Sequence, residues 1–167
     1  MDIKWSNFAN KELLSFIFKI VFIGIIVFII SNYLFQLCVI RGDSMYPTLK
    51  NGQLIIAQKF NLNLQYGDIV VIYKNEKKII KRVVGMPGDF IKIDGYLYIN
   101  GQISDNYLFD DTEPEIEEFK LNEDEFFVLG DNVNNSTDSR FEEIGIIYRD
   151  EIKGKMIFNN NNNWRKK

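Results

Sequence analysis

A serine on a predicted bend is the first residue of this chain whose type and surroundings could support covalent catalysis. Ser44 lies in the segment Gly42-Asp43-Ser44-Met45-Tyr46-Pro47-Thr48-Leu49. The small residue Gly42 and the turn-forming Asp43 precede the hydroxyl of Ser44. Pro47 fixes its own φ at about −65°, which makes the bend rigid. A plainer interpretation is also open, because polar turns of this composition are common where an apolar segment meets a folded domain.

The absence of histidine restricts the base that could activate Ser44. The 167 residues contain no histidine and a single cysteine, Cys38. A Ser-His-Asp triad, a Cys-His pair and a zinc site of Cys and His are therefore excluded. The base that activates Ser44 must therefore be a Lys, Asp, Glu or Tyr. A metal could be bound only by carboxylates. We expect no cofactor.

Lys81 is the best candidate for that base. It lies in the run Ile79-Ile80-Lys81-Arg82-Val83-Val84, where the alternation of a strand puts it on the same face as Ile79 and Val83. At an ordinary pKa of ~10.4, about 1 in 2,500 lysine amines is neutral at pH 7, and apolar surroundings lower the pKa by disfavouring the charged form. The alternative is a strand lysine that extends its amine to solvent or to an acid, although no acid lies nearer in the sequence than Glu76.

A polar loop is the third stretch that could take part in chemistry. The residues Gly130-Asp131-Asn132-Val133-Asn134-Asn135-Ser136-Thr137-Asp138-Ser139-Arg140 follow a predicted strand at Glu125–Leu129. Asp138 and Arg140 could pair and fix the loop, and the Ser136 hydroxyl could orient a lysine amine. Taken alone, the segment is equally typical of an ordinary asparagine-rich loop.

An apolar segment precedes Ser44. Residues 13–40 are apolar almost throughout, and the run Ile20–Ile30 extends to about 20 residues, enough to span the hydrocarbon core of a bilayer as a helix. A cleavable secretory signal is the competing interpretation. The apolar core of a secretory signal is usually shorter than this segment. The bulky residues Gln36–Ile40 also offer no small-x-small cleavage site, so we predict a permanent transmembrane anchor.

The charges flanking this segment predict its orientation. Lys4, Lys11 and Lys19 precede the core of the span, and Arg41 lies close behind it. The positive-inside rule then places residues 1–12 in the cytoplasm and the rest of the chain after the anchor outside the cell membrane.

The remainder of the chain predicts a mainly β fold, an antiparallel β-sheet domain over residues 41–158. No stretch after residue 50 has helical periodicity, so we expect helix only in the anchor, and Asp94-Gly95 is a strong hairpin signal. An acidic stretch at about 101–124 predicts a small inserted excursion. Residues 159–167 predict a frayed C-terminal tail. The net charge of −3 argues against nucleic acid as a binding partner. The predicted strands are Gln53–Gln58, Asp68–Tyr73, Lys78–Val84, Phe90–Asp94, Tyr96–Asn100 and Glu125–Leu129.

Taken together and in order behind one apolar span, these motifs resemble the type I signal peptidases of bacteria, serine proteases with a Ser-Lys dyad. The resemblance covers the chain from the anchor to about residue 154 and implies the signal-peptidase fold. It is carried by Ser44–Leu49, Gly67–Val71, Lys81–Asp89, Gly130–Asn132 and Ser136–Arg140. The relatives of the endoplasmic reticulum place a histidine where the bacterial enzymes place the lysine, so the bacterial type alone fits.

The resemblance implies a role for each matching residue. Ser44 would be the nucleophile and Lys81 the unprotonated general base. Ser136 would orient the Lys81 amine, and Asp138 with Arg140 would support the loop. The backbone N–H of Ser44 would donate one hydrogen bond to the oxyanion.

Two departures from the family pattern bear on these roles. Some relatives have a serine two residues before the nucleophile as a second oxyanion donor, where this chain has Gly42, as in the Gram-positive pattern. A water or a backbone amide could take that place. The family loop often carries Arg-Asp where this chain has Val133-Asn134, so those charges play no part here.

The implied function is a membrane-anchored serine endopeptidase that cleaves signal peptides from secretory preproteins after a small-x-small site. The preprotein would add as a strand beside Ser44, with Ile40, Leu49 and Ile80 lining shallow pockets and the lipid bilayer holding the enzyme near the cleavage site. Two alternatives remain: a specialised Ser-Lys processing protease, and a catalytically silent membrane-tethered β-domain.

Overall fold

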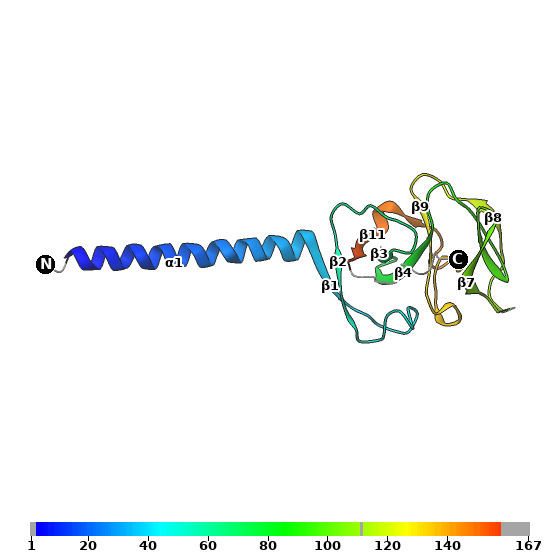
Figure 1. Ribbon diagram of the computed structural model, residues 1–167, viewed down its shortest axis with the longest axis horizontal. Helices are drawn as coiled ribbons and strands as arrows, with labels where there is room; N and C mark the ends of the chain where they lie inside the picture. The colour runs from blue at the N-terminus through cyan, green and yellow to red at the C-terminus, as the bar shows by residue number, and fades with distance from the viewer. Residues whose placement is uncertain (1–2, 111, 158–167) are drawn as a thin grey trace.

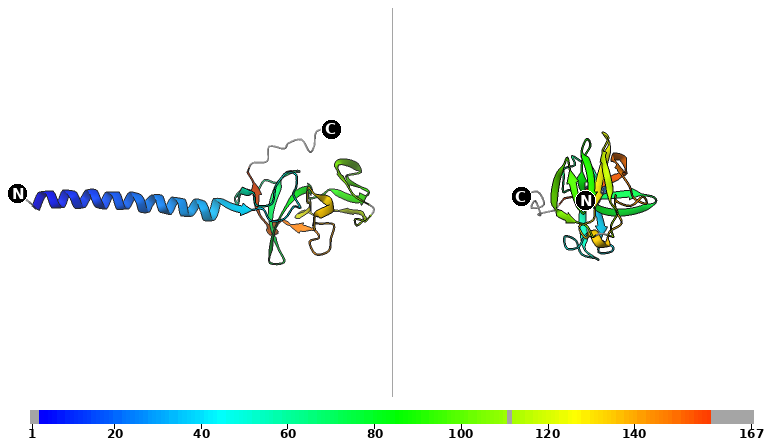
Figure 2. Two further views of the ribbon diagram at one scale, coloured as in Figure 1. Left: turned by 90° about the horizontal axis from the view of Figure 1, so that it is seen from below. Right: turned by 90° about the vertical axis from the view of Figure 1, so that its right-hand side faces the viewer.

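The structure is a computed structural model that describes residues 3–110 and 112–157. A single long helix, α1 (Ile3–Ile29), projects from a domain built of β-strands (Figure 1). Seen along the long axis of the molecule, the helix lies behind the middle of the β domain (Figure 2). The helix therefore continues the long axis and does not pack along the side of the domain.

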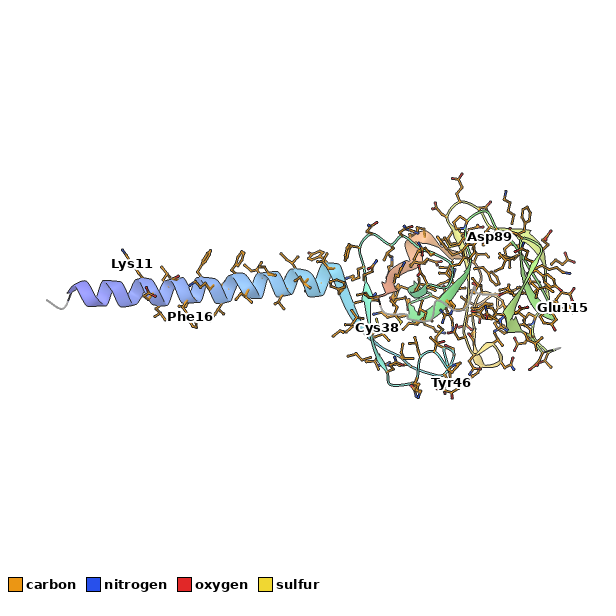
Figure 3. The ribbon with its side chains drawn as sticks, in the orientation of Figure 1. Lys11, Phe16, Cys38, Tyr46, Asp89 and Glu115 are labelled. Carbon is orange, nitrogen blue, oxygen red and sulfur yellow. The ribbon has the colours of Figure 1, made fainter. Side chains whose placement is uncertain are left out.

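The exposed helix has the length and composition of a membrane span. The segment Lys11–Leu34 contains an 18-residue stretch with a mean hydropathy of 3.0, none of which is buried by the rest of the protein. Its 24 residues would measure about 36 Å as a helix, against about 30 Å for a hydrocarbon core. In Figure 3, Lys11 and the apolar Phe16 both extend outward from the helix into the surroundings.

The apolar run ends as a strand and not as a helix. The helix passes through a single π turn, Ile30–Leu34, into strand β1 (Phe35–Val39). The expected anchor of residues 13–40 therefore extends too far, because an apolar run alone does not separate a helix end from a buried strand. β1 pairs antiparallel with β2 (Leu54–Gln58), so its backbone groups are satisfied within a sheet.

The predicted fold class is confirmed, because every strand pair described is antiparallel. A seven-stranded sheet has the order β1-β2-β11-β3-β4-β9-β10, and a four-stranded sheet has the order β7-β6-β5-β8. The remaining strands are β3 (Ile69–Lys74), β4 (Lys77–Gly85), β5 (Phe90–Asp94), β6 (Tyr96–Ile99), β7 (Gln102–Leu108), β8 (Ile116–Lys120), β9 (Glu125–Leu129), β10 (Ile147–Tyr148) and β11 (Ile152–Met156).

Several predicted strands agree with the structure, and others were missed. β5 and β9 have the predicted bounds, β2 and β6 differ from the prediction by one residue at one end, and β3 and β4 differ by one residue at both ends. The acidic stretch at about 101–124 contains β7 and β8, which form half of the small sheet. Two short 3-10 turns, Val133–Asn135 and Arg149–Glu151, correct the expectation of helix only in the anchor. The predicted tail lies outside the described residues.

The buried apolar side chains of the described residues form three clusters. One lies around Val70, Val83 and Val128 in the middle of the large sheet. A second joins the two sheets around Leu97 and Phe127. The third cluster packs the Ser44 segment onto the first strands, and its members are Cys38, Ile40, Met45, Leu49, Ile55, Ala57, Ile69 and Val71.

Candidate active site

The segment that carries Ser44 is held by turn hydrogen bonds and by two buried anchors. The amide of Tyr46 donates to the carbonyl of Asp43 at 3.0 Å, and the amide of Leu49 donates to the carbonyl of Met45 at 2.8 Å. Met45 and Leu49 are each 1% exposed, whereas Tyr46 extends outward at the edge of the domain (Figure 3). Ser44 itself is half-buried, so its segment is fixed while its position stays close to solvent.

Gly42 allows the backbone conformation that this turn requires. Its φ is +85°, in the region that side chains with a Cβ rarely adopt. Its amide donates to Asn51 Oδ1 at 3.2 Å. This N–H is therefore used within the protein, and the second oxyanion donor discussed above is not supplied by it in this state.

Lys81 lies in the interior, opposite Val70 in the β3–β4 pair. The residue is 4% exposed, and its Nζ lies 3.0 Å from Ser136 Oγ. Among the residues that the structure describes, no carboxylate forms an ion pair with it. Desolvation by burial is the largest influence and lowers the pKa of Lys81; nearby Asp138 partly opposes this and Arg140 adds to it. The site therefore favours a neutral amine more than water does.

Gly130, directly after β9, is where the serine segment and the polar loop meet. A Cβ at this position would lie 2.2 Å from Ser136 Oγ and 2.5 Å from the carbonyl oxygen of Ser44. The same carbonyl accepts a hydrogen bond from the amide of Asn132 at 3.0 Å, and Asn132 Nδ2 donates to the carbonyl of Asp43 at 3.1 Å. The structure thus brings the backbone of Ser44 next to Ser136, which in turn contacts Lys81.

Asp138 and Arg140, which were expected to pair, form an ion pair with both side chains fully buried. Arg140 Nε lies 2.8 Å from Asp138 Oδ1. The other carboxylate oxygen of Asp138 accepts a hydrogen bond from the amide of Gly130 at 3.0 Å. Arg140 Nη2 donates to the carbonyl of Ser136 at 3.1 Å. The pair therefore holds both sides of the loop that presents the Ser136 hydroxyl.

A second buried ion pair, Arg82 with Asp131, was not predicted. Arg82 Nε and Nη2 bind the two carboxylate oxygens of Asp131 at 2.7 and 2.5 Å, the two-point geometry that arginine prefers. Arg82 Nη1 donates to the carbonyl of Gly67 at 2.7 Å, and Nη2 contacts Thr48 Oγ1 at 3.3 Å. This pair ties the strand of Lys81 to the Ser44 segment and to the loop after β9. The sequence signals were an arginine in an apolar strand and an aspartate at the start of the polar loop.

The three residues expected to line substrate pockets lie together in the third apolar cluster. Ile40 is 3% exposed and Leu49 is 1% exposed, and Ile80 is half-buried against them. They share this cluster with the buried Met45, the residue that follows Ser44. In this state Ile40 and Leu49 are core residues, and Ile80 alone of the three keeps a partly exposed side chain.

The donor set of the described residues does not suit a metal. Among residues 3–110 and 112–157, no group of three or more His, Cys, Asp or Glu side chains is placed to hold an ion. The arrangement instead offers a serine on a fixed bend, a desolvated amine and a serine hydroxyl bound to that amine. These are the groups that proton transfer and acyl transfer need.

Comparison with known proteins relates most of the chain to one family. The profile of the family described as signal peptidase, peptidase S26, matches residues 13–160. Signal peptidase I S of Bacillus subtilis (strain 168) is 33% identical over 178 residues, covering 94% of this chain and 95% of that protein. Signal peptidase IB of Staphylococcus aureus (strain Mu50) is 31% identical over 173 residues, covering 89% and 90%. A crystal structure of a signal peptidase I from Enterococcus faecalis V583 is 28% identical, covers 56% of this chain and 96% of its own, and has a TM-score of 0.44.

Proposed function

Because the chain belongs to the peptidase S26 family and is a hydrolase of the signal peptidase I type, we propose that it cleaves signal peptides with Ser44 as nucleophile and Lys81 as general base. Membership of this family supports cleavage of signal peptides. The assignment of Ser44 and Lys81 as the catalytic dyad is our proposal. The observation that supports the dyad best is the buried Lys81 amine, which lies 3.0 Å from Ser136 Oγ.

In the proposed mechanism, the neutral amine of Lys81 accepts the proton of Ser44 Oγ as this oxygen attacks the carbonyl carbon of the scissile bond. The backbone N–H of Ser44 donates to the oxygen that becomes negative. Lys81 then returns the proton to the leaving amine, and an acyl ester remains on Ser44. A water molecule attacks the ester, with Lys81 taking its proton and returning one to Ser44 Oγ.

Ser136 and the Asp138–Arg140 pair are proposed to position the amine. The hydroxyl of Ser136 limits where the flexible lysine chain can place its nitrogen. Both partners of the ion pair are fully buried, so the loop they hold has few alternative positions. Positioning of this kind matters because a misplacement of about 1 Å can reduce a rate by about 100-fold.

We further propose that the enzyme is a single-pass membrane protein with its N-terminus in the cytoplasm and its β domain outside. The exposed apolar helix supports the anchor, and the lysines at its start support the orientation. The outer face of the first two strands supports a close contact with the bilayer. Four of the side chains on this face are exposed and apolar: Leu37, Val39, Leu54 and Ile56. They face one another across the β1–β2 pair, directly after the helix.

The substrate is proposed to be the signal peptide of a secretory preprotein, bound as an extended strand. Among the described strands, β1 lies at one edge of the large sheet and leads into the Ser44 segment. An edge strand carries unpaired backbone groups that an extended peptide can pair with. Residues with small side chains before the scissile bond would then lie beside Ser44.

The test is cleavage of a preprotein by the full chain in mild detergent, followed by sequencing of the new N-terminus. We expect cleavage after a small-x-small site, and its loss in both Ser44→Ala and Lys81→Ala. Two matched variants serve as controls: Ser104→Ala on β7, and Lys78→Ala, an exposed lysine on the same strand as Lys81. Activity that survives Lys81→Ala would overturn the dyad while leaving the family function in place, and no cleavage by the wild type would favour a silent β domain.

A further inference from the structure

The buried guanidinium of Arg140 has a partner that lies outside the polar loop of residues 130–140, which is the catalytic loop of the proposed mechanism. Glu113 Oε2 is 2.5 Å from Arg140 Nη1, and the side chain of Glu113 is 15% exposed while that of Arg140 is 0% exposed. Glu113 belongs to the connection between β7 and β8 of the small sheet, 27 residues before its partner. The acidic excursion therefore reaches into the site through one carboxylate.

The hydrogen bonds of Arg140 are divided between this excursion and the catalytic loop. Nε and Nη2 bind Asp138, and Nη2 also donates to the carbonyls of Val133 and Ser136. Among the residues that the structure describes, Nη1 has one acceptor, and this acceptor is Glu113. Without it, a fully buried cationic nitrogen would lose its charge-assisted hydrogen bond, which is a costly state for a buried charge.

The same excursion also covers the flat face of the guanidinium. The centre of the guanidinium lies 5.1 Å from the ring of Phe109 and 5.3 Å from the ring of Phe141. Phe109 comes directly after β7, is 5% exposed, and its amide donates to the carbonyl of Gly95. The small sheet thus supplies an aromatic ring and a carboxylate to one side chain of the catalytic loop.

From this arrangement we propose that Glu113 is a positioning residue of the peptidase site, which couples the β7–β8 excursion to the alignment of Ser136 with Lys81. The inference rests on the proposed Ser44–Lys81 mechanism. The path runs from Glu113 to Arg140, from Arg140 Nη2 to the carbonyl of Ser136 at 3.1 Å, and from Ser136 Oγ to Lys81 Nζ at 3.0 Å. Glu113 touches neither of the reacting groups, so it acts through Arg140.

The chain offers a matched control for this position. Glu115 lies two residues later in the same excursion and is exposed, and Figure 3 shows it at the end of the molecule farthest from the helix. Both glutamates contribute one negative charge to the same segment. A general effect of charge or of excursion stability would therefore appear at both positions, whereas a positioning effect would appear at Glu113 alone.

The experiment measures kcat and KM of the full chain in detergent with a synthetic fluorogenic peptide whose scissile bond follows Ala-x-Ala. We expect Glu113→Ala to lower kcat by about tenfold or more with KM within about twofold. Glu113→Gln keeps an acceptor oxygen, so its kcat should fall less than that of Glu113→Ala. Glu115→Ala should have the kcat and KM of the wild type. Thermal unfolding of each variant establishes that it is folded at the assay temperature. If Glu113→Ala is not folded there, Glu113→Gln decides: a kcat equal to that of Glu115→Ala overturns the proposal.

A double-mutant cycle with Ser136→Ala separates positioning from an independent structural effect. If Glu113 acts through Ser136, the Glu113→Gln change should have little further effect on kcat once the Ser136 hydroxyl is removed. An equal fold-loss in both backgrounds would overturn the proposed path. Failure of the mechanism itself is distinguishable, because in that case Lys81→Ala would remain active whatever residue occupies position 113.

Discussion

Lys81 Nζ and Ser136 Oγ lie 3.0 Å apart in the interior, although 55 residues separate them in the sequence. The partner is a hydroxyl, which can accept a hydrogen bond from an amine or donate one to it. A carboxylate in the same place would have stabilised the ammonium form and raised the pKa. The pairing of a buried amine with a neutral group is therefore what allows the lysine to serve as a base, and it has consequences for both rate and stability.

The first prediction concerns the pH dependence of the rate. Burial lowers the pKa of Lys81, so kcat/KM should rise about tenfold per pH unit below that pKa and level off above it. Lys81→Arg should be inactive at every pH, because a guanidinium does not release its proton in a protein. Lys78→Arg, at an exposed position of the same strand, should keep the wild-type profile. A wild-type profile that is flat between about pH 6 and pH 9 would exclude Lys81 as the base.

The second prediction concerns stability. Unfolding returns Lys81 to water, where its pKa is near the ordinary value of 10.5, above the folded pKa. Between those two pKa values the unfolded chain binds more protons, so the free energy of unfolding rises with pH across that window. Below the folded pKa, the cost of burying the amine is present in full.

Lys81→Met removes the titrating group while keeping a side chain of similar length. The variant should gain stability relative to the wild type at low pH, and this difference should shrink as the pH rises toward 10.5. Thermal unfolding in detergent, followed by circular dichroism at several pH values, measures it. Lys78→Met provides the exposed control and should give a constant difference. A constant difference for Lys81→Met would mean that its amine is not desolvated.

The third prediction concerns Gly130. A methyl group there would lie 2.2 Å from Ser136 Oγ and 2.5 Å from the backbone oxygen of Ser44, so these groups would have to separate. Gly130→Ala should lower kcat by about 100-fold or more. Gly85→Ala serves as the control, because its methyl group would lie 2.8 Å from Ile91 Cδ1 and from Phe127 Cβ in the core. We expect Gly85→Ala to lower the unfolding midpoint while the folded fraction keeps its kcat, and an active Gly130→Ala would contradict the geometry of the site.

The sheet strands could be predicted where both faces follow a simple pattern. The run Phe90–Asp94 alternates between exposed and less exposed residues, and its partner follows directly after the turn signal Asp94-Gly95, so its bounds were predicted correctly. The strand Phe35–Val39 was missed because it continues an apolar segment without interruption. The strand Ile116–Lys120 was missed because its exposed Glu117 and Glu118 dominate the composition, although Ile116 and Phe119 are half-buried.

The candidate site could be predicted only as far as local motifs reach. Ser44 and Lys81 lie in segments whose neighbours already indicate a bend and a buried strand. Asp131 and Glu113 pair with arginines that are 49 and 27 residues away. Nothing in their own neighbourhood specifies those partners, because the contact exists only once the loop after β9 has packed onto β4 and onto the small sheet.

The fourth prediction concerns the Arg82–Asp131 pair, whose side chains are 5% and 9% exposed. Asp131→Ala leaves the guanidinium uncompensated in the interior, which should cost about 3–5 kcal/mol of stability. Asp131→Asn keeps the shape and one acceptor and should cost less. The double variant Arg82→Met/Asp131→Leu removes both charges and should be more stable than Asp131→Ala. Thermal unfolding in detergent measures all three, and a double variant no more stable than Asp131→Ala would show that the charge is not what destabilises it.

The fifth prediction concerns the apolar face of β1 and β2. Leu37 and Leu54 are 66% and 60% exposed on the first two strands after the helix, so a membrane that holds the helix would also meet this face. Leu37→Gln/Leu54→Gln should reduce cleavage of a preprotein in lipid vesicles by roughly fivefold or more, since each leucine contributes apolar area that is removed from water. Cleavage of a soluble peptide in detergent should be unchanged, because neither residue belongs to the buried core.

Ile103→Gln/Leu108→Gln is the matched control for that face. These two residues are 52% and 60% exposed on β7 of the small sheet, which lies at the end of the domain away from the helix (Figure 1). Both double variants remove similar apolar surface, so a loss of solubility or of general stability would affect them alike. A bilayer contact predicts a loss in vesicles for the first variant alone. Equal rates for the two variants in vesicles would mean that the helix tethers the domain without this face touching the lipid.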